Sequence, residues 1–427
     1  MKPRTVLVVE VAGAAEEFFP FTCLHCLWEL RWGPWRLIEW WQRLFPEARC
    51  GVATCPERMA WCRSFLARFP LHRLSGLEFP ALVLNAQLLP QRQSVQWIAA
   101  HIHAEPGASW AACVNGVWAA AWIAAEPQQP LWINGTVSIW GAEQEAFLRT
   151  LPQLEYDFPL VHGLWEVLAT LPEAFAEAEG VLSLGTALEP WSARGVWILE
   201  PERVWIAPGV ELAPGVVLDA REGAIILGER AVVQPHAVLF GPCSVGEQSL
   251  VRAHATIGRF TAIGEHCRIG GEIAHSVVHA YANKQHEGFV GHSYLGEWVN
   301  FGAGTTTSNL KNTYGTVRIR LPSGERQTGM QFLGTLCGDH TKTAIGTCLR
   351  TGAVVGISAN ILSGGMQAPL VPSFSWGDAA QPQPYRLEKA LEVARRVMAR
   401  RGKQLCAEEE ELFRREYCRV WGNKREE

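Results

Sequence analysis

The chain has 427 residues, of which 48% are apolar, and a mean hydropathy near zero, so it is long enough for two or three globular domains with sizeable cores. Its net charge of −4 supplies no overall basic field, which argues against nucleic acid and anionic membranes as partners. The longest apolar runs, such as 117–125, are too short to span a bilayer and no signal-peptide core precedes Glu10. We therefore expect a cytoplasmic protein with reduced thiols.

Strand-like and helix-like segments alternate over the first 150 residues. Residues 5–11 (TVLVVEV) form a β-branched run that is typical of a buried strand, and residues 81–89 (ALVLNAQLL) predict a second strand. Between them, residues 27–45 repeat apolar side chains at roughly helical spacing. We therefore predict a doubly wound α/β domain over residues 1–150.

Two groups of His and Cys in this domain invite a metal interpretation. Cys23 and Cys26 flank His25 with the spacing of half a zinc site, but no second pair follows, so we expect core thiols. His101 and His103 would face the same side of a strand, where a surface pair or a hydrogen-bonded core pair is the more common arrangement. The sequence alone identifies no metal ligands.

From residue 206 onward, aliphatic residues recur every six positions, which is the clearest periodic signal in the chain. Gly follows the aliphatic residue in five of the eight later repeats, consistent with a tight turn once per repeat. This period is the signature of a left-handed parallel β-helix, which we predict over residues 199–376. The repeat residues are Ile206, Leu212 and Leu218 and, after an insertion near 221–223, Leu227, Val233, Leu239, Val245, Val251, Ile257, Ile263 and Ile269.

The repeat is interrupted twice, and other structure is expected on either side of it. We predict a surface loop at 271–290 and a second excursion at 312–332, because the hexads resume after each. A connector with a helix near 163–178 is expected over 151–198, and a helical cap over 377–427. The cap has an apolar stripe of Leu387, Leu391, Ala394 and Met398. Its basic residues form either a solvated face or an aid to phosphate binding: Arg395, Arg396, Arg400, Arg401 and Lys403.

Polar residues crowd a Gly-rich stretch at 289–311 (FVGHSYLGEWVNFGAGTTTSNLK). Leu295 and Phe301 lie six residues apart and each precedes Gly, so this stretch belongs to strands and turns of the solenoid. His292 lies just before that pair, and an imidazole is suited to take a proton near neutral pH. We predict an active site here; a histidine that only bonds a backbone carbonyl at a coil corner is the alternative.

With the hexads around it and CGDHTKTAIG after it, this stretch resembles the acetyltransferase domain of the bifunctional glucosamine-1-phosphate N-acetyltransferase / N-acetylglucosamine-1-phosphate uridylyltransferase family. It is most similar to a variant branch of sugar nucleotidyltransferases that also has NKQH, GHSYLGEWVN and an Arg-rich terminal helix. The resemblance covers most of residues 200–400 and is weaker over 1–150. It implies a homotrimer with each site between subunits, and acetyl transfer from acetyl-CoA to the 2-amino group of glucosamine 1-phosphate.

The resemblance also implies roles for single residues. His292 matches the catalytic base, which would take the proton as the amine attacks the thioester. Tyr294 and Asn300 match residues that contact the sugar. The acetyl-CoA lining is matched by Ala303, Asn309 and Leu310.

The residues that would bind the sugar phosphate resemble those of the family less closely. Glu272 fits the family's sugar-contacting Glu, but the Lys that follows it in the family is Ala274 here. We expect Lys284 to supply that charge, and Arg259 is the nearest candidate for the phosphate-binding Arg. These departures leave the identity of the sugar phosphate open.

The N-terminal half departs further from the family's uridylyltransferase domain, whose Gly-rich loop cradles nucleotide phosphates. Residues 20–33 (PFTCLHCLWELRWG) resemble the opening segment of the variant branch and keep Arg31 and Gly33, while Asn85 lies in a counterpart of its next motif. If these residues bind a nucleotide, UTP and Mg²⁺ are implied. We expect the fold to persist and uridylyl transfer to be reduced or lost.

Two other functions compete with acyl transfer. One is a regulatory or scaffold protein that binds a sugar nucleotide, and the other is a nucleotidyltransferase whose β-helix is not catalytic. The combination of His292 and Asn300 favours acyl transfer that feeds UDP-N-acetylglucosamine synthesis.

Overall fold

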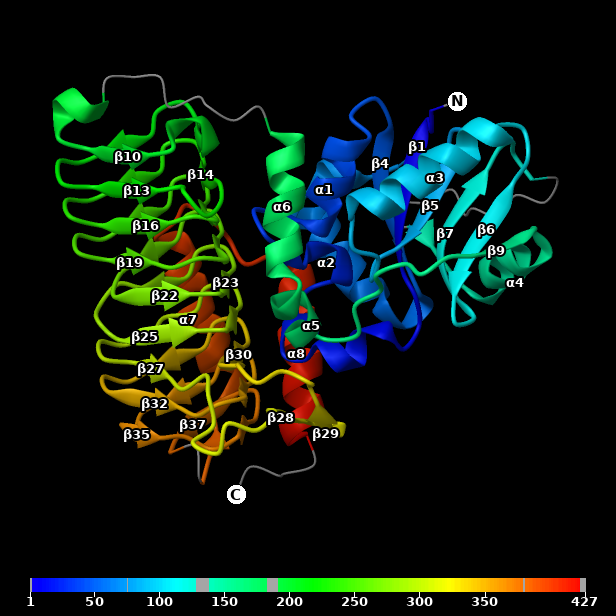
Figure 1. Cartoon of the computed structure of the whole chain (residues 1–427). Coiled ribbons are helices and arrows are strands. Elements are labelled where there is room, and N and C mark those ends of the chain that lie inside the picture. The colour runs from blue at the N-terminus through cyan, green and yellow to red at the C-terminus, as the bar shows by residue number, and fades with distance from the viewer. Residues whose placement is uncertain (1, 75, 128–137, 183–190, 379–380, 423–427) are drawn as a thin grey trace.

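Three parts make up the computed structural model, which describes residues 2–74, 76–127, 138–182, 191–378 and 381–422. An α/β domain lies beside a parallel β-helix, and C-terminal helices pack against both (Figure 1). The three components expected from the sequence are therefore confirmed. Within the described residues, no helix has the length and apolar character needed to cross a membrane.

The N-terminal domain is built on a mixed sheet of seven strands in the order β8-β4-β1-β5-β7-β6-β9. Its central strand β1 pairs in parallel with β4 and β5 and is buried along its whole length, as expected for a strand covered on both sides. The strands are β1 (Thr5–Glu10), β4 (Arg49–Thr54), β5 (Ala81–Asn85), β6 (Trp110–Val114), β7 (Val117–Ile123), β8 (Ser138–Ile139) and β9 (Gln153–Glu155). The helices are α1 (Leu37–Leu44), α2 (Met59–Arg68), α3 (Arg92–Ala104) and α4 (Ala142–Thr150).

Two local predictions in this domain are wrong. Residues 27–45 are α-helical only over Leu37–Leu44. A short 3-10 helix (Leu27–Glu29) comes first, and a turn at Gly33 (φ 63°) then forms a hairpin of β2 (Arg31–Trp32) and β3 (Trp35–Arg36). His101 and His103 lie on the helix α3 rather than on a strand. The buried residues of α3 are Ser94, Ile98 and Ile102, a spacing of four that outweighs the local alternation.

The β-helix has three faces. The first face runs from β10 (Trp197–Leu199) through β13 (Val217–Asp219), β16 (Val238–Phe240), β19 (Thr256–Ile257), β22 (Glu272–Ala274), β25 (Phe289–Gly291), β27 (Thr306–Thr307) and β32 (Thr347–Leu349) to β35 (Gly365–Met366). The second contains β11 (Val204–Ile206), β14 (Ile225–Leu227), β17 (Cys243–Val245), β20 (Thr261–Ile263), β23 (Val277–Val278), β26 (Tyr294–Leu295), β30 (Thr335–Cys337), β33 (Ala353–Val355) and β36 (Leu370–Val371). The third contains β12 (Glu211–Leu212), β15 (Val232–Val233), β18 (Leu250–Val251), β21 (Arg268–Ile269), β24 (Asn283–Lys284), β31 (Lys342–Thr343), β34 (Asn360–Ile361), β37 (Ser375–Gly377) and β38 (Gln383–Pro384).

The repeat residues point into the solenoid, where Val233, Ile257 and Ile269 have no exposed surface. The surface loop predicted at 271–290 is wrong, because these residues form β22 to β25 and continue the three faces. The six-residue repeat is hard to recognise there, because the turns are shorter and Lys284 takes the place of an inward aliphatic residue. By contrast, the excursion at 312–332 does leave the coil and forms a hairpin of β28 (Arg318–Leu321) and β29 (Gly324–Gln327).

The second face of the β-helix is covered by the N-terminal domain. Outward residues of this face, among them Ile226, Val277 and Leu336, belong to the same core as the N-terminal domain. The domain contributes many of the chain's Trp side chains to its interior, including the fully buried Trp28, Trp32, Trp40, Trp41, Trp122 and Trp140. The abundant Trp therefore fill the N-terminal domain and its contact with the β-helix.

The remaining helices bridge these two bodies. α5 (Leu164–Ala169) and α6 (Leu171–Val181) replace the single helix expected near 163–178; residues 183–190 of the expected connector lie outside the described part of the chain. α7 (Leu387–Ala399) buries Leu391, Ala394 and Met398 of the predicted stripe, while Leu387 is half-buried; α8 (Ala407–Trp421) packs on α2. Arg395 and Arg396 of α7 pair with Glu410 and Glu392.

Candidate functional site

His292 occupies a corner of the β-helix, in the turn between β25 on the first face and β26 on the second. Its φ of 47° is uncommon for a non-glycine residue, and both backbone groups are bonded, the N–H to Ala274 O (3.1 Å) and the C=O to Gly334 N (2.8 Å). The His275 ring stacks on one side (centroids 4.3 Å, planes 11° apart) and the Phe332 ring on the other (5.3 Å, 25°). The imidazole is held between two rings.

The ring bonds a side chain rather than a backbone carbonyl. Asn309 Nδ2 lies 2.9 Å from His292 Nδ1. In this arrangement the amide donates to Nδ1 and the proton of the neutral ring sits on Nε2. A half-turn of the amide makes Oδ1 accept from Nδ1–H and frees the Nε2 lone pair for a substrate. Asn309 is thus placed to select the tautomer of His292.

Burial, together with a smaller effect of the neighbouring His275, lowers the pKa of His292 to about 4. The ring is therefore neutral at pH 7. A neutral imidazole with one fixed nitrogen and one free nitrogen is the form that accepts a proton from a nucleophile.

The residues predicted for acetyl-CoA and the sugar are brought together only in part. Leu310 follows Asn309 and forms an isolated bridge to Phe332, so these three lie together near His292. Ala303 lies at the corner between the third and first faces. Asn300 is exposed on the third face, where it bridges β24 and β31. Within a single copy of the chain, Asn300 and Ala303 therefore lie apart from His292.

Tyr294 points away from any open site. Its side chain is 1% exposed, packs edge-on against Phe21 at 5.6 Å between ring centroids, and accepts a hydrogen bond from the backbone N–H of Arg31 (3.0 Å). The tyrosine therefore fastens the N-terminal domain to the second face.

The three sugar-phosphate candidates differ in accessibility. Lys284 is 1% exposed, and its ammonium donates to the carbonyls of Gly270 (3.2 Å) and His286. Glu272 is exposed on the first face, in register with Phe289 of β25. Arg259 lies at the corner that also bears His292 and pairs with the exposed Glu222. Glu272 and Arg259 are open to a ligand on the first face, whereas Lys284 is enclosed.

The predicted nucleotide residues are engaged within the fold, and of the three only Arg31 bonds the β-helix. Arg31 pairs with Glu265 of the β-helix (2.5 Å), and Gly33 packs so closely on Ala174 that a Cβ would come within 2.9 Å of its side chain. Asn85 donates to Trp118 O (3.0 Å) and accepts from the N–H of Gln87 (2.9 Å). These groups are already engaged.

Sequence reasoning missed a buried ionic cluster between the two bodies. His25 lies 2.5 Å from Asp339 and 3.1 Å from Glu29, and its pair with Asp339 spans 314 residues. Burial lowers the pKa of His25, but these two carboxylates outweigh it and raise the pKa to about 10, so the ring is an imidazolium at neutral pH. The segment resembling a nucleotide motif is thus the centre of the domain contact. Further members are Arg36, Arg68, Glu265, His279 and Glu297.

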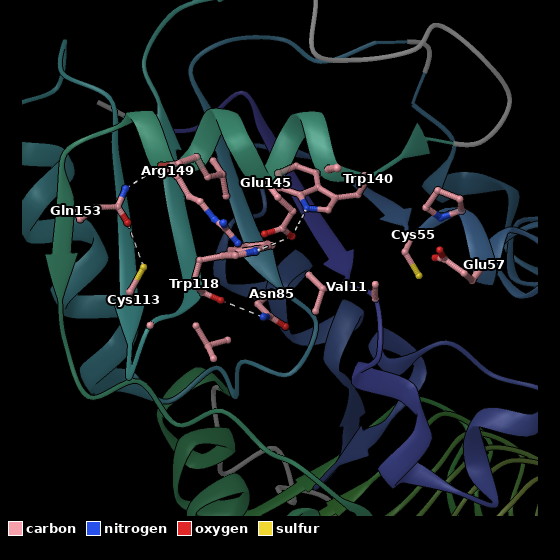
Figure 2. Close-up of a pocket in the computed structure, with 17 residues that line it drawn as sticks. Val11, Cys55, Glu57, Asn85, Cys113, Trp118, Trp140, Glu145, Arg149 and Gln153 are labelled. Carbon is pink, nitrogen blue, oxygen red and sulfur yellow. Dashed lines mark hydrogen bonds between the residues drawn. The ribbon is translucent and has the colours of Figure 1, made fainter.

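A cavity of about 630 Å³ lies at the carboxyl ends of the parallel strands of the N-terminal domain. Figure 2 shows Trp118 and Trp140 beside Glu145, whose Oε1 accepts from both indole N–H groups at 3.0 and 2.8 Å. Among the described lining residues the charged side chains are Glu57, Glu145 and Arg149. One cation against two carboxylates is a poor match to the charge of UTP, and the described residues contain no cluster of three metal-ligating side chains. The cavity does not fit UTP with Mg²⁺.

No protein-family model matches the chain. The bifunctional protein GlmU of Desulfitobacterium hafniense is 33% identical over 241 residues, 48% of this chain and 51% of that protein. A bifunctional sugar-1-phosphate nucleotidylyltransferase/acetyltransferase of Sulfurisphaera tokodaii is 30% identical over 145 residues, which are 34% and 36% of the two chains. The chain spans at most about half the length of these curated relatives.

One solved structure, an Arabidopsis UDP-N-acetylglucosamine acyltransferase, is similar with a TM-score of 0.28 at 14% identity, covering 54% of this chain and 91% of that one. The sequence relatives share one description, which combines a sugar-phosphate nucleotidylyltransferase with an acetyltransferase or carries the name GlmU. Over up to about half of its length, the chain is thus similar to bifunctional GlmU-type nucleotidylyltransferase/acetyltransferases.

Proposed function

We propose that the chain transfers an acetyl group from acetyl-CoA to the amine of glucosamine 1-phosphate or a related amino-sugar phosphate, with His292 as general base. The observation that carries the proposal is the bond of His292 to Asn309 between two stacked rings, within a chain related to acetyltransferases. Acetyl transfer of this kind would feed the synthesis of UDP-N-acetylglucosamine.

In the proposed reaction the amine nitrogen attacks the thioester carbonyl while Nε2 of His292 takes a proton from the amine. A C–N bond forms, the C–S bond breaks, and the proton leaves with the CoA thiol. With its amide turned so that Oδ1 accepts from Nδ1–H, Asn309 holds the tautomer whose Nε2 is free. Since an adjacent anion favours the imidazolium, the substrate phosphate raises the pKa of His292 when it binds, which makes the ring a better base.

A homotrimer would complete this site. Asn300 on the third face and Ala303 at the next corner are distant from His292 in one copy, yet both match the same site in the family. If the three-sided β-helices of two copies packed side by side, a corner of one copy would lie against a face of the next. The first face, which ends at the His292 corner, lies on the side of the β-helix away from the N-terminal domain (Figure 1). We propose that neighbours meet there.

Replacing His292 by Ala tests the proposed base. Free thiol released from acetyl-CoA in the presence of glucosamine 1-phosphate should fall by about 10²–10⁴-fold, the usual contribution of a general base. His236→Ala is a matched control, because His236 is also a corner residue with positive φ, stacked on His254, at a different corner. Full activity in His292→Ala would refute the role.

The same assay separates the rival functions when UTP is added and pyrophosphate is measured alongside thiol. Thiol without pyrophosphate is expected, since the N-terminal cavity lacks the positive charge that a triphosphate needs. Pyrophosphate without thiol would favour a nucleotidyltransferase with a non-catalytic β-helix. Binding of a sugar nucleotide without either product would favour the regulatory or scaffold function.

A further inference from the structure

We infer that His275 is a positioning residue of the acyl-transfer site: its ring holds the His292 imidazole in place and is itself held by the carbonyl of Leu168, which comes from the N-terminal side of the chain. The inference rests on the proposed function of His292 and adds a part that the β-helix cannot supply alone.

The two rings belong to neighbouring coils and to the same corner. His275 lies between β22 and β23, and His292 between β25 and β26, each with a φ of 47°. Their planes are 11° apart with centroids at 4.3 Å, and Phe260, one coil further, meets His275 edge-on at 5.3 Å. Because Phe332 covers the opposite side of His292, sideways movement of the imidazole is blocked in both directions.

The His275 ring has one fixed orientation. Its Nε2 lies 3.0 Å from the carbonyl oxygen of Leu168 in α5. A carbonyl only accepts, so Nε2 carries the proton of the neutral ring. Burial lowers the pKa of His275, and the bond to Leu168 and the carboxylate of Glu173 on α6 act in the opposite direction. The described ionisable groups that act on the pair are thus Glu173 and the two rings themselves.

The carbonyl that holds His275 is tied to the N-terminal domain. Just before α5, Val161 exchanges two hydrogen bonds with Gln87, N–H to O at 3.0 Å and O from Nε2 at 2.8 Å. Gln87 follows β5, the strand whose last residue, Asn85, lines the N-terminal cavity. A continuous path of bonded groups therefore joins the N-terminal domain to the corner that bears His292.

This arrangement also keeps the proposed base neutral. Two stacked imidazoles cannot both take a proton without repulsion, and a ring covered on both sides loses the water that would stabilise its charge. Removing His275 would uncover one side of His292 and remove the repulsion that arises when both rings are protonated. The pKa of His292 should then rise from about 4 toward the ordinary value near 6.5.

The experiment compares His275→Ala with His275→Phe, which keeps a stacking ring but cannot bond Leu168. His275→Ala should lower kcat about tenfold, the scale of a slightly misplaced group, with KM for acetyl-CoA nearly unchanged. The acid limb of the pH profile of kcat/KM should also move to higher pH. His275→Phe should keep the acid limb at low pH but, without the bond to Leu168, should recover only part of kcat. His254→Ala, which removes a stacked corner ring elsewhere, is the control.

A second readout does not depend on activity. Titration of the His292 ring signal by NMR in protein labelled at histidine should show the same upward pKa shift in His275→Ala and little shift in His275→Phe. Unchanged kcat and an unchanged His292 titration in folded His275→Ala would overturn the inference, as would equal damage in both variants. Failure of the proposed function would appear separately, as full activity in His292→Ala.

Discussion

Lys284 places an ammonium in the column of inward residues on the third face. It stands in register with Ile269, where an aliphatic side chain would continue the stack, and it bonds only carbonyls. Burial lowers its pKa to about 8, with Glu287 acting weakly in the opposite direction. A cation enclosed in this way costs stability as long as it is charged.

Lys284→Met should therefore stabilise the fold. The pKa of Lys284 falls from 10.5 to about 8 on folding, so the penalty is full below pH 8 and disappears as the pH rises toward 10.5. Urea unfolding at pH 7 should show a gain in the free energy of unfolding of about 1–3 kcal/mol, and this gain should shrink as the pH rises toward 10.5. The exposed Lys389→Met is the control. A large rise in KM for the sugar phosphate would instead mean that Lys284 reaches the substrate.

At the scale of elements, α8 packs along the side of the β-helix (Figure 1). Phe413 is 1% exposed and meets both Phe374 and His340 edge-on, and the Trp421 indole donates to Ser373 O (2.9 Å). Phe374 lies between β36 and β37 and His340 between β30 and β31, so both contacts fall at the same corner of different coils. The helix therefore covers the side of the β-helix along this corner.

Phe413→Ala should destabilise the protein by about 3–5 kcal/mol, the range for removing a buried aromatic ring. The remaining folded protein should keep its kcat, because α8 does not touch His292 or its stacked neighbours. Chemical denaturation measures the first effect and the thiol assay the second. Arg415→Ala, on the exposed side of the same helix, should change neither. A stable Phe413→Ala variant would contradict this packing role.

At the scale of the whole molecule, buried charges decide how the two bodies are joined. The pKa of His25 is raised to about 10, so its contribution is full below pH 6.5 and is lost as the pH rises to 10. Burial raises the pKa of Glu29, but Arg68 and His25 lower it to about 2, so its contribution is full above pH 4.5 and lost below. The junction is strongest between about pH 4.5 and 6.5.

Asp339→Asn removes the closest partner of His25 and leaves a buried cation with one carboxylate fewer. The variant should lose about 3–5 kcal/mol at pH 6, and its stability should fall less steeply between pH 6.5 and 10 than that of the parent. Unfolding curves at several pH values measure both. Glu47→Gln, which breaks the exposed pair with Lys2, should have no measurable effect. An unchanged pH slope in Asp339→Asn would refute the assignment.

These scales differ in what the sequence reveals. Hexads predict the β-helix because each coil depends on near neighbours, and the same regularity brings His292 beside Asn309. Residues 271–290 escape detection since Lys284 and shortened turns break the period without breaking the structure. The buried ionic cluster has no local sequence signal. His25 and Asp339 form an ion pair only because segments 314 residues apart in the sequence pack together.

That separation has a consequence for synthesis. A ribosome that adds about 5–20 residues per second needs about 15–60 s to make the stretch between His25 and Asp339. During this time the outer side of the N-terminal core, with Phe21, Trp28 and several charges, has no second face to pack on. The first half of the chain is therefore made with part of its core surface exposed, and it is the half that we expect chaperones to bind during synthesis.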